Sequence, residues 1–439
     1  MTTINGIQDG EAFFSNEEYF LVFSLENRFG KISKYNHQYE LLANLELPEL
    51  KPFSPKYQFR TNFEVFENRI VLLIIGANFR GAEESTMLYI DRNPLKLSKE
   101  VRFSENDINF LWNSGFIGNT YGRQEFGVYS IEHRNWKNCE VQLQIFDLEG
   151  EMTKSLSMKM PMYYKDFAVS GVHNTDNGCY LFYYDASKES IDSLDYLLID
   201  STNTVERGAL PLVGNINRVN TVFKNLDTLT LIVFEERNSQ LCDPSVLVSL
   251  QLRDIDINSK EVIQTSEQFY DIQFSVLPRA RIHGKYSLNK CTGMVVNNNM
   301  LIRDIIAKEG ELYITMERLG LRGDSDEEYP IQSHWYIFTA SFDKSLNLNQ
   351  YCTMRRSTFS RLNIGDFTLN LREDGTKDII YYNQNEGVIL LDGYENGCFR
   401  EEKIYDTGGF SMNRVSFINE NAIALPTEEK LIIVELDRE

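Results

Sequence analysis

One repeat constrains the fold of this chain more than any other feature: a short apolar segment, followed by a stretch that ends in an apolar residue and then Asp or Asn. The repeat occurs eight times in 439 residues. Its apolar segments are rich in Val, Ile, Tyr and Phe and are bounded by turn residues, which is typical of β-strands rather than helices. The segments lie at 19–23, 70–75, 126–131, 179–184, 229–234, 312–316, 379–382 and 421–425.

Turn residues flank each segment on both sides. The cluster that precedes it contains Asn, Asp, Gly or charged residues, and Asn, Asp and Gly supply the positive φ angles that two-residue hairpins require. The Asp or Asn that follows it can bond the backbone two residues on, which is a local reason for its recurrence. These residues are Asn36, Asp91, Asp147, Asp200, Asp256, Asp343, Asp392 and Asp437, at spacings of 55, 56, 53, 56, 87, 49 and 45.

A period of about 50 residues indicates a unit of four strands. Such a unit cannot bury both faces of its sheet alone, so neighbouring units must stack, and stacking in a ring removes exposed edges. The last unit, 414–439, has three strands, and residues 1–7 precede the first unit and could supply the fourth. We therefore predict an all-β fold: one closed β-propeller domain over 1–439, with eight blades favoured and seven as the alternative.

Over essentially its whole length the chain resembles β-propeller repeat proteins. The resemblance is architectural, because the signatures of the best-known sequence classes are missing. There is no Gly-His and Trp-Asp pair of the WD40 kind, no double-Gly kelch signature, and no Ser-x-Asp-x-Gly-x-x-Trp box of the sialidase kind. Since one fold hosts many functions, this resemblance does not fix what the protein does.

The net charge of the chain restricts the classes of partner that it is expected to bind. It carries 64 acidic and 44 basic residues, a net charge of −20. Such a surface repels phosphate backbones, so nucleic acid is not expected to bind, while a basic protein or metal cations would be attracted. Acidity that keeps a large β-protein soluble is the simpler explanation.

Location is predicted from the absence of targeting segments. No stretch reaches the roughly 18 apolar residues of a membrane span, and no signal peptide is visible after Met1. We expect a cytoplasmic protein if Met1 is the native start, and a secreted or surface-anchored one if a leader has been removed. The six cysteines are scattered without a CxxC pair, which favours reduced, partly buried thiols over disulfides.

The two ends of the predicted strands differ. Turns between first and second strands, and between third and fourth strands, are tight. The connections between second and third strands are predicted to be long loops, at 77–86, 132–139, 235–246 and 318–333, and the largest spacing predicts an insert at about 265–298 between blades. Long loops on a rigid scaffold are the usual place of binding function.

Candidate binding residues follow from these loops. Trp beside His or Arg can anchor a partner or stack on a sugar, although core or strand positions explain the same residues more simply. The acidic run 323–328 could chelate a hard cation, but it lacks the ordered spacing of a calcium loop, and a solvated loop is favoured. The candidates are Arg80, His133, Arg134, Trp136, His334 and Trp335 for binding, and Asp324, Asp326 and Glu328 as weak metal ligands.

A second acidic segment is not predicted to bind metal. Residues 254–258 read Asp-Ile-Asp-Ile-Asn and resemble the opening of a calcium loop. Alternation with Ile places the segment on a strand and its turn, the required glycine is absent, and Asp256 already belongs to the repeat.

The predicted function is a non-catalytic scaffold that binds a protein or a glycan through the long loops, alone or as a subunit of a larger assembly. The alternative is a carbohydrate-active or other hydrolytic enzyme, with paired carboxylates at the axial mouth of the ring. Five histidines, with no Gly-x-Ser-x-Gly, no HExxH and no phosphate-binding Gly-rich loop, give little support to nucleophilic catalysis. The sequence predicts no cofactor.

Overall fold

In the part of the chain that it describes, the computed structural model consists of β-strands and their connections, with a 3-10 turn at Asp166. It describes residues 2–5, 7, 11–26, 29–48, 58–78, 81–103, 114–117, 125–135, 138–163, 166–188, 190–200, 202–214, 216–236, 248–270, 300–322, 331–360, 367–371, 377–383, 387–395, 398–405, 416–419, 421–426 and 430–436. No helix in these ranges is long and apolar enough to cross a membrane. The chain divides into two compact units, and each is described by itself.

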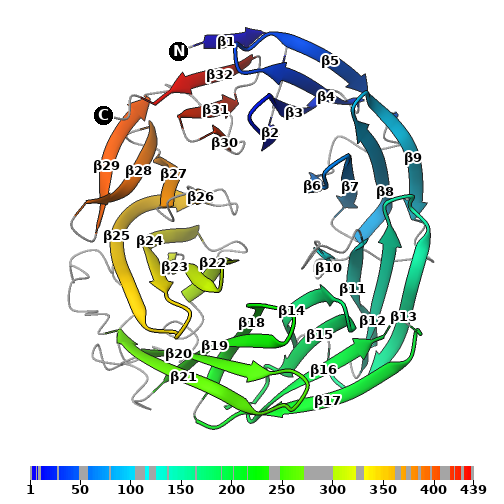
Figure 1. Ribbon diagram of the computed structural model, residues 1–439, viewed down its shortest axis with the longest axis vertical. Helices are drawn as coiled ribbons and strands as arrows, with labels where there is room; N and C mark the ends of the chain where they lie inside the picture. The colour runs from blue at the N-terminus through cyan, green and yellow to red at the C-terminus, as the bar shows by residue number, and fades with distance from the viewer. Residues whose placement is uncertain are drawn as a thin grey trace. The chain divides into compact units, whose positions relative to one another are not determined.

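Unit 1 comprises 1–108, 329–334 and 356–439, and its described strands form four four-stranded sheets (Figure 1). Sheet B is β2 (Glu11–Ser15), β3 (Tyr19–Glu26), β4 (Phe29–Asn36) and β5 (Leu41–Glu46); sheet C is β6 (Gln58–Val65), β7 (Arg69–Asn78), β8 (Gly81–Arg92) and β9 (Leu95–Phe103). Sheet H is β26 (Phe367–Leu371), β27 (Lys377–Asn383), β28 (Gly387–Glu395) and β29 (Cys398–Tyr405); sheet A is β30 (Ser416–Asn419), β31 (Ala422–Pro426), β32 (Lys430–Glu435) and β1 (Thr2–Asn5).

Unit 2 comprises 109–328 and 335–355, and its described part holds three four-stranded sheets and most of a fourth, sheet G, of which residues 331–334 and 356–360 belong to unit 1. Sheet D is β10 (Ser114–Ile117), β11 (Glu125–Asn135), β12 (Asn138–Asp147) and β13 (Met152–Met160); sheet E is β14 (Phe167–Thr175), β15 (Gly178–Asp185), β16 (Ser193–Ile199) and β17 (Val205–Pro211). Sheet F is β18 (Ile216–Phe223), β19 (Thr228–Glu236), β20 (Val248–Asp256) and β21 (Val262–Tyr270); sheet G is β22 (Met300–Lys308), β23 (Glu311–Arg322), β24 (Ile331–Phe342) and β25 (Leu348–Ser360).

The second strand of every sheet is one of the apolar segments found in the sequence, so this prediction is confirmed. Seven sheets are antiparallel at each strand pairing; in sheet G the described register covers β22 and β23. The described residues therefore support seven to eight blades of four strands.

The N-terminal strand completes the last sheet, as the sequence predicts. β1 pairs antiparallel with β32, with Thr2 opposite Ile433 and Asn5 opposite Lys430. Ile7 follows β1 and is 3% exposed, in a cluster with residues of β31 and β32. Residues from the two ends of the sequence thus share one sheet.

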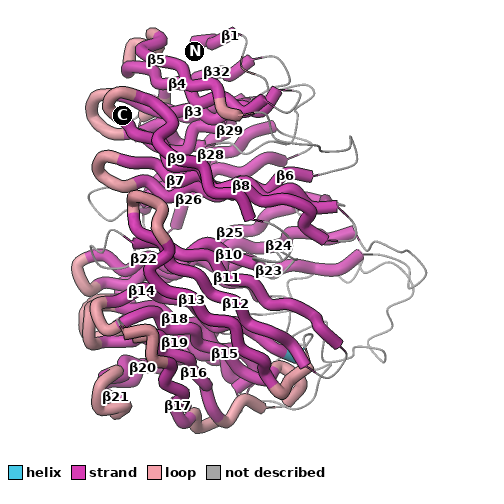
Figure 2. Tube along the Cα trace, turned by 90° about the vertical axis from the view of Figure 1, so that its right-hand side faces the viewer, coloured by secondary structure: helices cyan, strands magenta, loops and turns pink. Residues whose placement is uncertain are grey.

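The recurrent Asp or Asn ends the third strand and organises the turn to the fourth. In the turn after β20, Oδ1 of Asp256 accepts hydrogen bonds from the backbone N–H groups of Asn258 and Ser259, at 2.9 and 2.8 Å. The same pattern occurs at Asn36, Asp200 and Asp343, and Asp147 bonds the N–H of Glu151. We call this end of each sheet, with the turns after its first and third strands, the turn end. Figure 2 shows many of these turns in pink.

The core of each unit lies between neighbouring sheets. In unit 2, separate apolar clusters join sheets D and E, sheets E and F, and sheets F and G. In unit 1, clusters join sheets B and C, sheets A and B, and sheets H and A. First strands of neighbouring sheets also contact one another, β14 with β18 and β2 with β30. Stacked four-stranded sheets that meet at their first strands form a β-propeller-like arrangement.

Fourth strands begin with a β-bulge in several sheets, which the sequence analysis did not anticipate. In sheet F, Ile255 pairs with Val262 and Asp254 with Gln264, so Ile263 is the extra residue. Leu42 in sheet B, Ser98 in sheet C and Thr153 in sheet D occupy the same place. Each bulge lies opposite the apolar residue that precedes the recurrent Asp or Asn. A bulge changes which face consecutive side chains occupy.

The end opposite the turns, where second strands lead into third strands, is the hairpin end. The predicted long loops at 77–86 and 132–139 are wrong: β7 runs to Asn78 and β8 begins at Gly81, while β11 runs to Asn135 and β12 begins at Asn138. Strand pairing across each hairpin satisfies the backbone that a loop would expose to water. Of the predicted loop at 318–333, residues 318–322 belong to β23 and residues 331–333 to β24. The start of the predicted insert, residues 265–270, belongs to β21, and residues 271–299 lie outside the described ranges.

Candidate functional site

The predicted binding residues lie at hairpin ends or outside the described residues. His133 and Arg134 belong to β11, three and two residues before its hairpin connection at 136–137, and His334 and Trp335 belong to β24. They are therefore on strands, as the simpler of the two explanations from the sequence expects, and their role in binding stays a prediction. Outside the described residues lie Arg80, Trp136, Asp324, Asp326 and Glu328. In the ranges that the structure describes, no group of three or more His, Cys, Asp or Glu side chains could hold a metal ion.

Hairpin ends differ from sheet to sheet in length. In sheet C, β7 and β8 have 10 and 12 residues, and in sheet D, β11 and β12 have 11 and 10. In sheet E, β15 and β16 have 8 and 7. Because the turn ends are equivalent, the added residues lie at the hairpin ends. Pairing continues to Asn78 opposite Gly81 and to Asn135 opposite Asn138, so these hairpins carry their residues on a paired backbone.

A polar pair connects the first strands of two neighbouring sheets in unit 2. Nε2 of His173 on β14 lies 2.9 Å from Oγ1 of Thr221 on β18. The imidazole also packs against Phe223, with ring centroids 5.3 Å apart. Nearby, Ser170 Oγ donates a hydrogen bond to the carbonyl of Val219 at 3.0 Å. Both bonds join sheet E to sheet F on the inner side of their shared apolar cluster.

Gly171 permits the close approach of His173 and Thr221. A Cβ at this position would overlap Oγ1 of Thr221 and lie 2.6 Å from Nε2 of His173. The glycine also follows a β-bulge, since Val169 pairs with Tyr183 and Gly171 with Phe182. A bulge and a missing side chain together let the polar groups of two sheets meet.

Burial lowers the pKa of His173 to about 4, so the imidazole is neutral at pH 7. A neutral imidazole beside a hydroxyl is the arrangement that activates a nucleophile. Thr221 is 4% exposed, however, and its hydroxyl is covered by the neighbouring sheet. The pair therefore suits a hydrogen bond between sheets better than attack on a substrate.

A buried ion pair within sheet F includes the lysine that joins the turn ends of sheets F and G. Nζ of Lys224 lies 2.8 Å from Oδ2 of Asp254, and both side chains are 6% exposed. Nζ also donates to the carbonyl of Lys344, at 2.7 Å, and Thr230 Oγ1 donates to Oδ1 of Asp254 at the same distance. The expectation that 254–258 forms a strand and its turn is confirmed, because Asp254 lies in β20 and Asp256 ends it.

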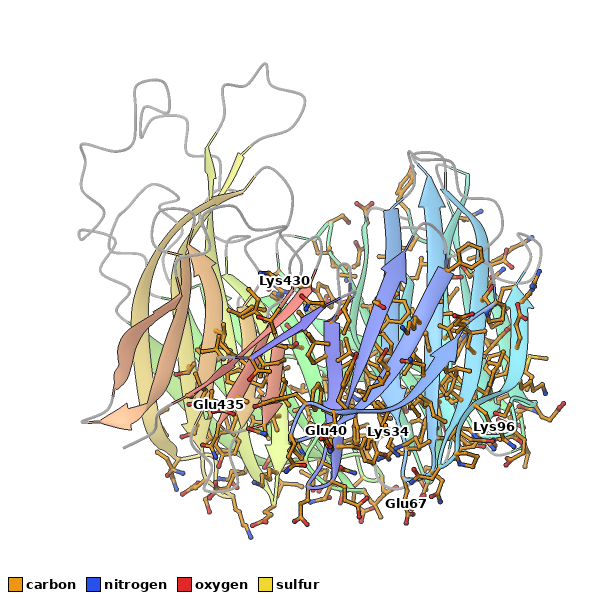
Figure 3. All side chains as sticks on the ribbon, turned by 90° about the horizontal axis from the view of Figure 1, so that it is seen from above. Lys34, Glu40, Glu67, Lys96, Lys430 and Glu435 are labelled. Atoms are coloured by element: carbon orange, nitrogen blue, oxygen red, sulfur yellow. The ribbon has the colours of Figure 1, made fainter. Side chains whose placement is uncertain are left out.

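In unit 1 a different buried cation, Arg92, joins the turn ends of two neighbouring sheets. Arg92 is 7% exposed and donates to the hydroxyl of Tyr19 and to the carbonyls of Phe66 and Glu67, at 2.6 to 2.8 Å. Its guanidinium lies 4.2 Å from the ring centroid of Phe14. Sheets B and C are thereby tied at their turn ends, where Lys34 and Glu67 also lie in Figure 3.

Sequence reasoning missed His173 and Thr221. Both are polar residues on a first strand, three or four positions before a tight turn, and this shared position is the signal that could have paired them. The expected reduced thiols are present where they are described: Cys139 and Cys179 are free and buried. Burial raises the pKa of Cys139 to about 11 and that of Cys179 to about 12, so both stay protonated at neutral pH.

Comparison with known proteins yields structural neighbours only. No family model matches the chain, and no curated protein matches it by sequence. The WD40 domain of SCAP from fission yeast is 8% identical, with 99% of this chain and 97% of that one covered and a TM-score of 0.47. An uncharacterized protein from Listeria monocytogenes is 9% identical, with 99% and 95% covered and a TM-score of 0.41. A Synechocystis apocarotenoid oxygenase mutant is 9% identical, with 89% and 90% covered and a TM-score of 0.41.

Because these identities and TM-scores are low, the fold is assigned from the sheets of the chain itself. Its repeated four-stranded antiparallel sheets, stacked on one another within each unit, have a β-propeller-like architecture.

Proposed function

We propose that the chain is a closed propeller of eight blades that acts as a non-catalytic scaffold and binds a protein partner through its hairpin ends. The observation that carries the binding proposal is the extension of strands β7, β8, β11 and β12 at that end alone. Eight four-stranded sheets and the pairing of β1 with β32 support the ring.

Extended hairpins suit recognition for a physical reason. Residues on a paired backbone lose little conformational freedom when a partner binds, which lowers the entropic cost of association. His133 and Arg134 reach the hairpin end of β11 in this way, and Trp136 follows them in the sequence. Aromatic and Arg side chains dominate the energetics of protein interfaces. The net charge of −20 favours a basic partner. A glycan is the second ligand class expected from the sequence.

The binding proposal is tested by shortening two hairpins. One variant joins Ile75 to Ser85, and another joins His133 to Cys139, each through an Asn-Gly turn, because these residues pair directly across their hairpins. A matched control, Glu309→Gln, changes an exposed residue at the turn end of sheet G. Proteins captured from a lysate by the immobilised chain are quantified for all forms.

We expect the captured partner to be lost with at least one shortened hairpin and kept with the control. Retention by both shortened forms, or loss with the control, would contradict the proposal. Small-angle X-ray scattering of the full chain tests the ring, because a closed ring and two separated units give different distance distributions. The hydrolytic site at the axial mouth stays a prediction.

A further inference from the structure

The turn ends of sheets F and B expose aliphatic side chains beside carboxylates. In sheet F, Val262 and Ile263 are 55% and 59% exposed, and Leu226, in the other turn of the same sheet, is 41% exposed. In sheet B, Leu41 and Leu42 are 51% and 53% exposed. Large aliphatic side chains exposed in a group mark interaction sites more often than single ones do.

The β-bulge explains why two consecutive side chains are exposed. Neighbouring residues of a regular strand point to opposite faces, so one of a pair would face the core. In sheet F the extra residue Ile263 disturbs this alternation, and Val262 and Ile263 both reach solvent. Leu42 does the same in sheet B. The matching bulge in sheet C has the polar Ser98 and the half-buried Leu97, which packs against sheet B.

Carboxylates lie in the same turns as both aliphatic pairs. Sheet F carries Asp227, Asp256 and Glu261 in its two turns, and the turns are joined because Asn258 Nδ2 donates to Oδ1 of Asp227 at 3.1 Å. Lys260 of the same turn has a carboxylate of its own, Glu206 at 3.5 Å. Sheet B carries Glu17, Glu18 and Glu40 in the corresponding turns.

The support beneath the sheet F pair is firm. Gln264 follows Ile263 and its side-chain amide donates to the carbonyl of Ser345 in sheet G. The buried pair of Lys224 and Asp254 lies beneath the same two turn ends. A partner therefore meets side chains whose backbone is already ordered, which favours binding without an ordering cost.

We propose that the turn ends of sheets F and B bind a protein segment that carries Lys or Arg next to Leu, Ile or Val. The aliphatic side chains of the segment would cover the exposed pair, and its cations would face the carboxylates. In each sheet this binding site lies at the opposite end from the hairpin, and it does not depend on the function proposed for the hairpins.

The proposal is tested with three soluble peptides in a Gly/Ser background. The first carries lysines and two leucines, the second has Glu in place of Lys, and the third has Ser in place of Leu. Binding to the full chain is measured by isothermal titration calorimetry at low and at physiological ionic strength. The protein variants are Val262→Ser with Ile263→Ser, Leu41→Ser with Leu42→Ser, and Asp227→Asn with Glu261→Gln.

Two control variants test whether binding requires these particular side chains or only any exposed apolar or acidic side chain. Phe29→Ser removes an apolar side chain that is 54% exposed at a hairpin end, and Glu309→Gln removes an exposed carboxylate from the turn of sheet G. Circular dichroism and thermal unfolding confirm that every variant is folded, since the altered side chains are exposed.

We expect only the Lys/Leu peptide to bind tightly, with about two peptides for each chain. Each Ser double variant should leave one site, and the Asn/Gln variant should weaken the sheet F site by about tenfold and reduce its dependence on salt. The controls should bind as the wild type does. Equal binding of the Glu/Leu peptide, equal losses in the controls, or no binding at all would overturn the proposal.

Discussion

The turn ends and the hairpin ends of the same sheets differ in what sets their structure. At the turn ends, Asp or Asn side chains bond the backbone of each turn, and Lys224 and Arg92 tie neighbouring sheets together. At the hairpin ends, strand length changes from 8 residues in β15 to 12 in β23 without a change at the other end. The comparison teaches that a recurrent Asp or Asn keeps the described turns alike at one end, while the lengths of the described strands vary at the other.

The largest effect is expected from the buried ion pair. Asp254→Ala leaves Lys224 buried without its carboxylate, and removal of one partner of such a pair costs about 3–5 kcal/mol. Urea-induced unfolding measures the loss. The double variant Lys224→Met with Asp254→Leu removes both charges and should recover most of the stability, while an Asp254→Ala variant as stable as the wild type would contradict the assigned role.

The pH dependence of stability tests the inner strands. His173 has a pKa of about 4 in the folded chain and an ordinary value of 6.5 when unfolded. The unfolded chain therefore binds the proton more readily, and the stabilisation is full above pH 6.5 and is lost as the pH falls toward 4. The loss amounts to about 3 kcal/mol for this group.

His173→Gln serves as the control, because Gln cannot take up the proton and other carboxyl groups titrate equally in both proteins. Chemical denaturation at pH 7 and pH 5 should show a smaller difference in unfolding free energy for the variant. The same pH dependence in both proteins would show that His173 does not titrate as its burial requires.

A smaller effect is expected at Gly171. Gly171→Ala places a Cβ against Thr221 and His173, and overpacking of this kind costs about 1–3 kcal/mol. In a Thr221→Ala background the same change should cost less, because the overlapping hydroxyl is gone. Thermal unfolding of the four proteins of this double-mutant cycle gives the coupling, and an absence of coupling would disprove the close approach.

The loss of the side-chain bonds in a single turn should decrease stability less than the change at Gly171. Asp256→Ala removes the oxygen that accepts two backbone hydrogen bonds, and a modest decrease in the thermal midpoint should follow. Asp256→Asn keeps an acceptor and should decrease it less. These bonds hold the pKa of Asp256 below its usual range, so the contribution of the turn should fade in acid as the carboxyl group takes up its proton.

The smallest effect is expected at a hairpin end. The variant that joins His133 to Cys139 through Asn-Gly keeps the buried Cys139 and removes only the end of the hairpin. Its thermal midpoint should stay within about 2 °C of the wild type, as for changes away from buried features. A large decrease would remove the contrast between the two ends.

Local chemistry made much of the fold predictable. The segments 70–75 and 179–184 are continuous apolar runs because the second strand of a blade is covered on both faces, and both are confirmed as β7 and β15. The recurrent Asp accepts a hydrogen bond within its own turn, so a single residue such as Asp200 is enough to predict that turn from the sequence. The exchange of β1 into the last sheet followed from counting strands.

Contacts between distant residues were beyond sequence reasoning. Residues 77–86 contain Gly and several charges, a composition that predicts a loop, whereas pairing between β7 and β8 stabilises residues 77–78 and 81–86 as strands. Lys224 and Asp254 are 30 positions apart, and His173 and Thr221 are 48 apart. The position of His173 and Thr221 shortly before a tight turn is the one local signal for these pairs, because strand register and the stacking of sheets decide which polar groups meet.

The pairing of β1 with β32 also has a consequence for synthesis. Ribosomes make β1 before its strand partner, so Thr2 to Asn5 cannot pair with it until more than 400 further residues have been added. Sheet A can form only when residues 430–435 have emerged. A chain released before residue 430 would carry unpaired strand edges, the features by which incomplete proteins aggregate.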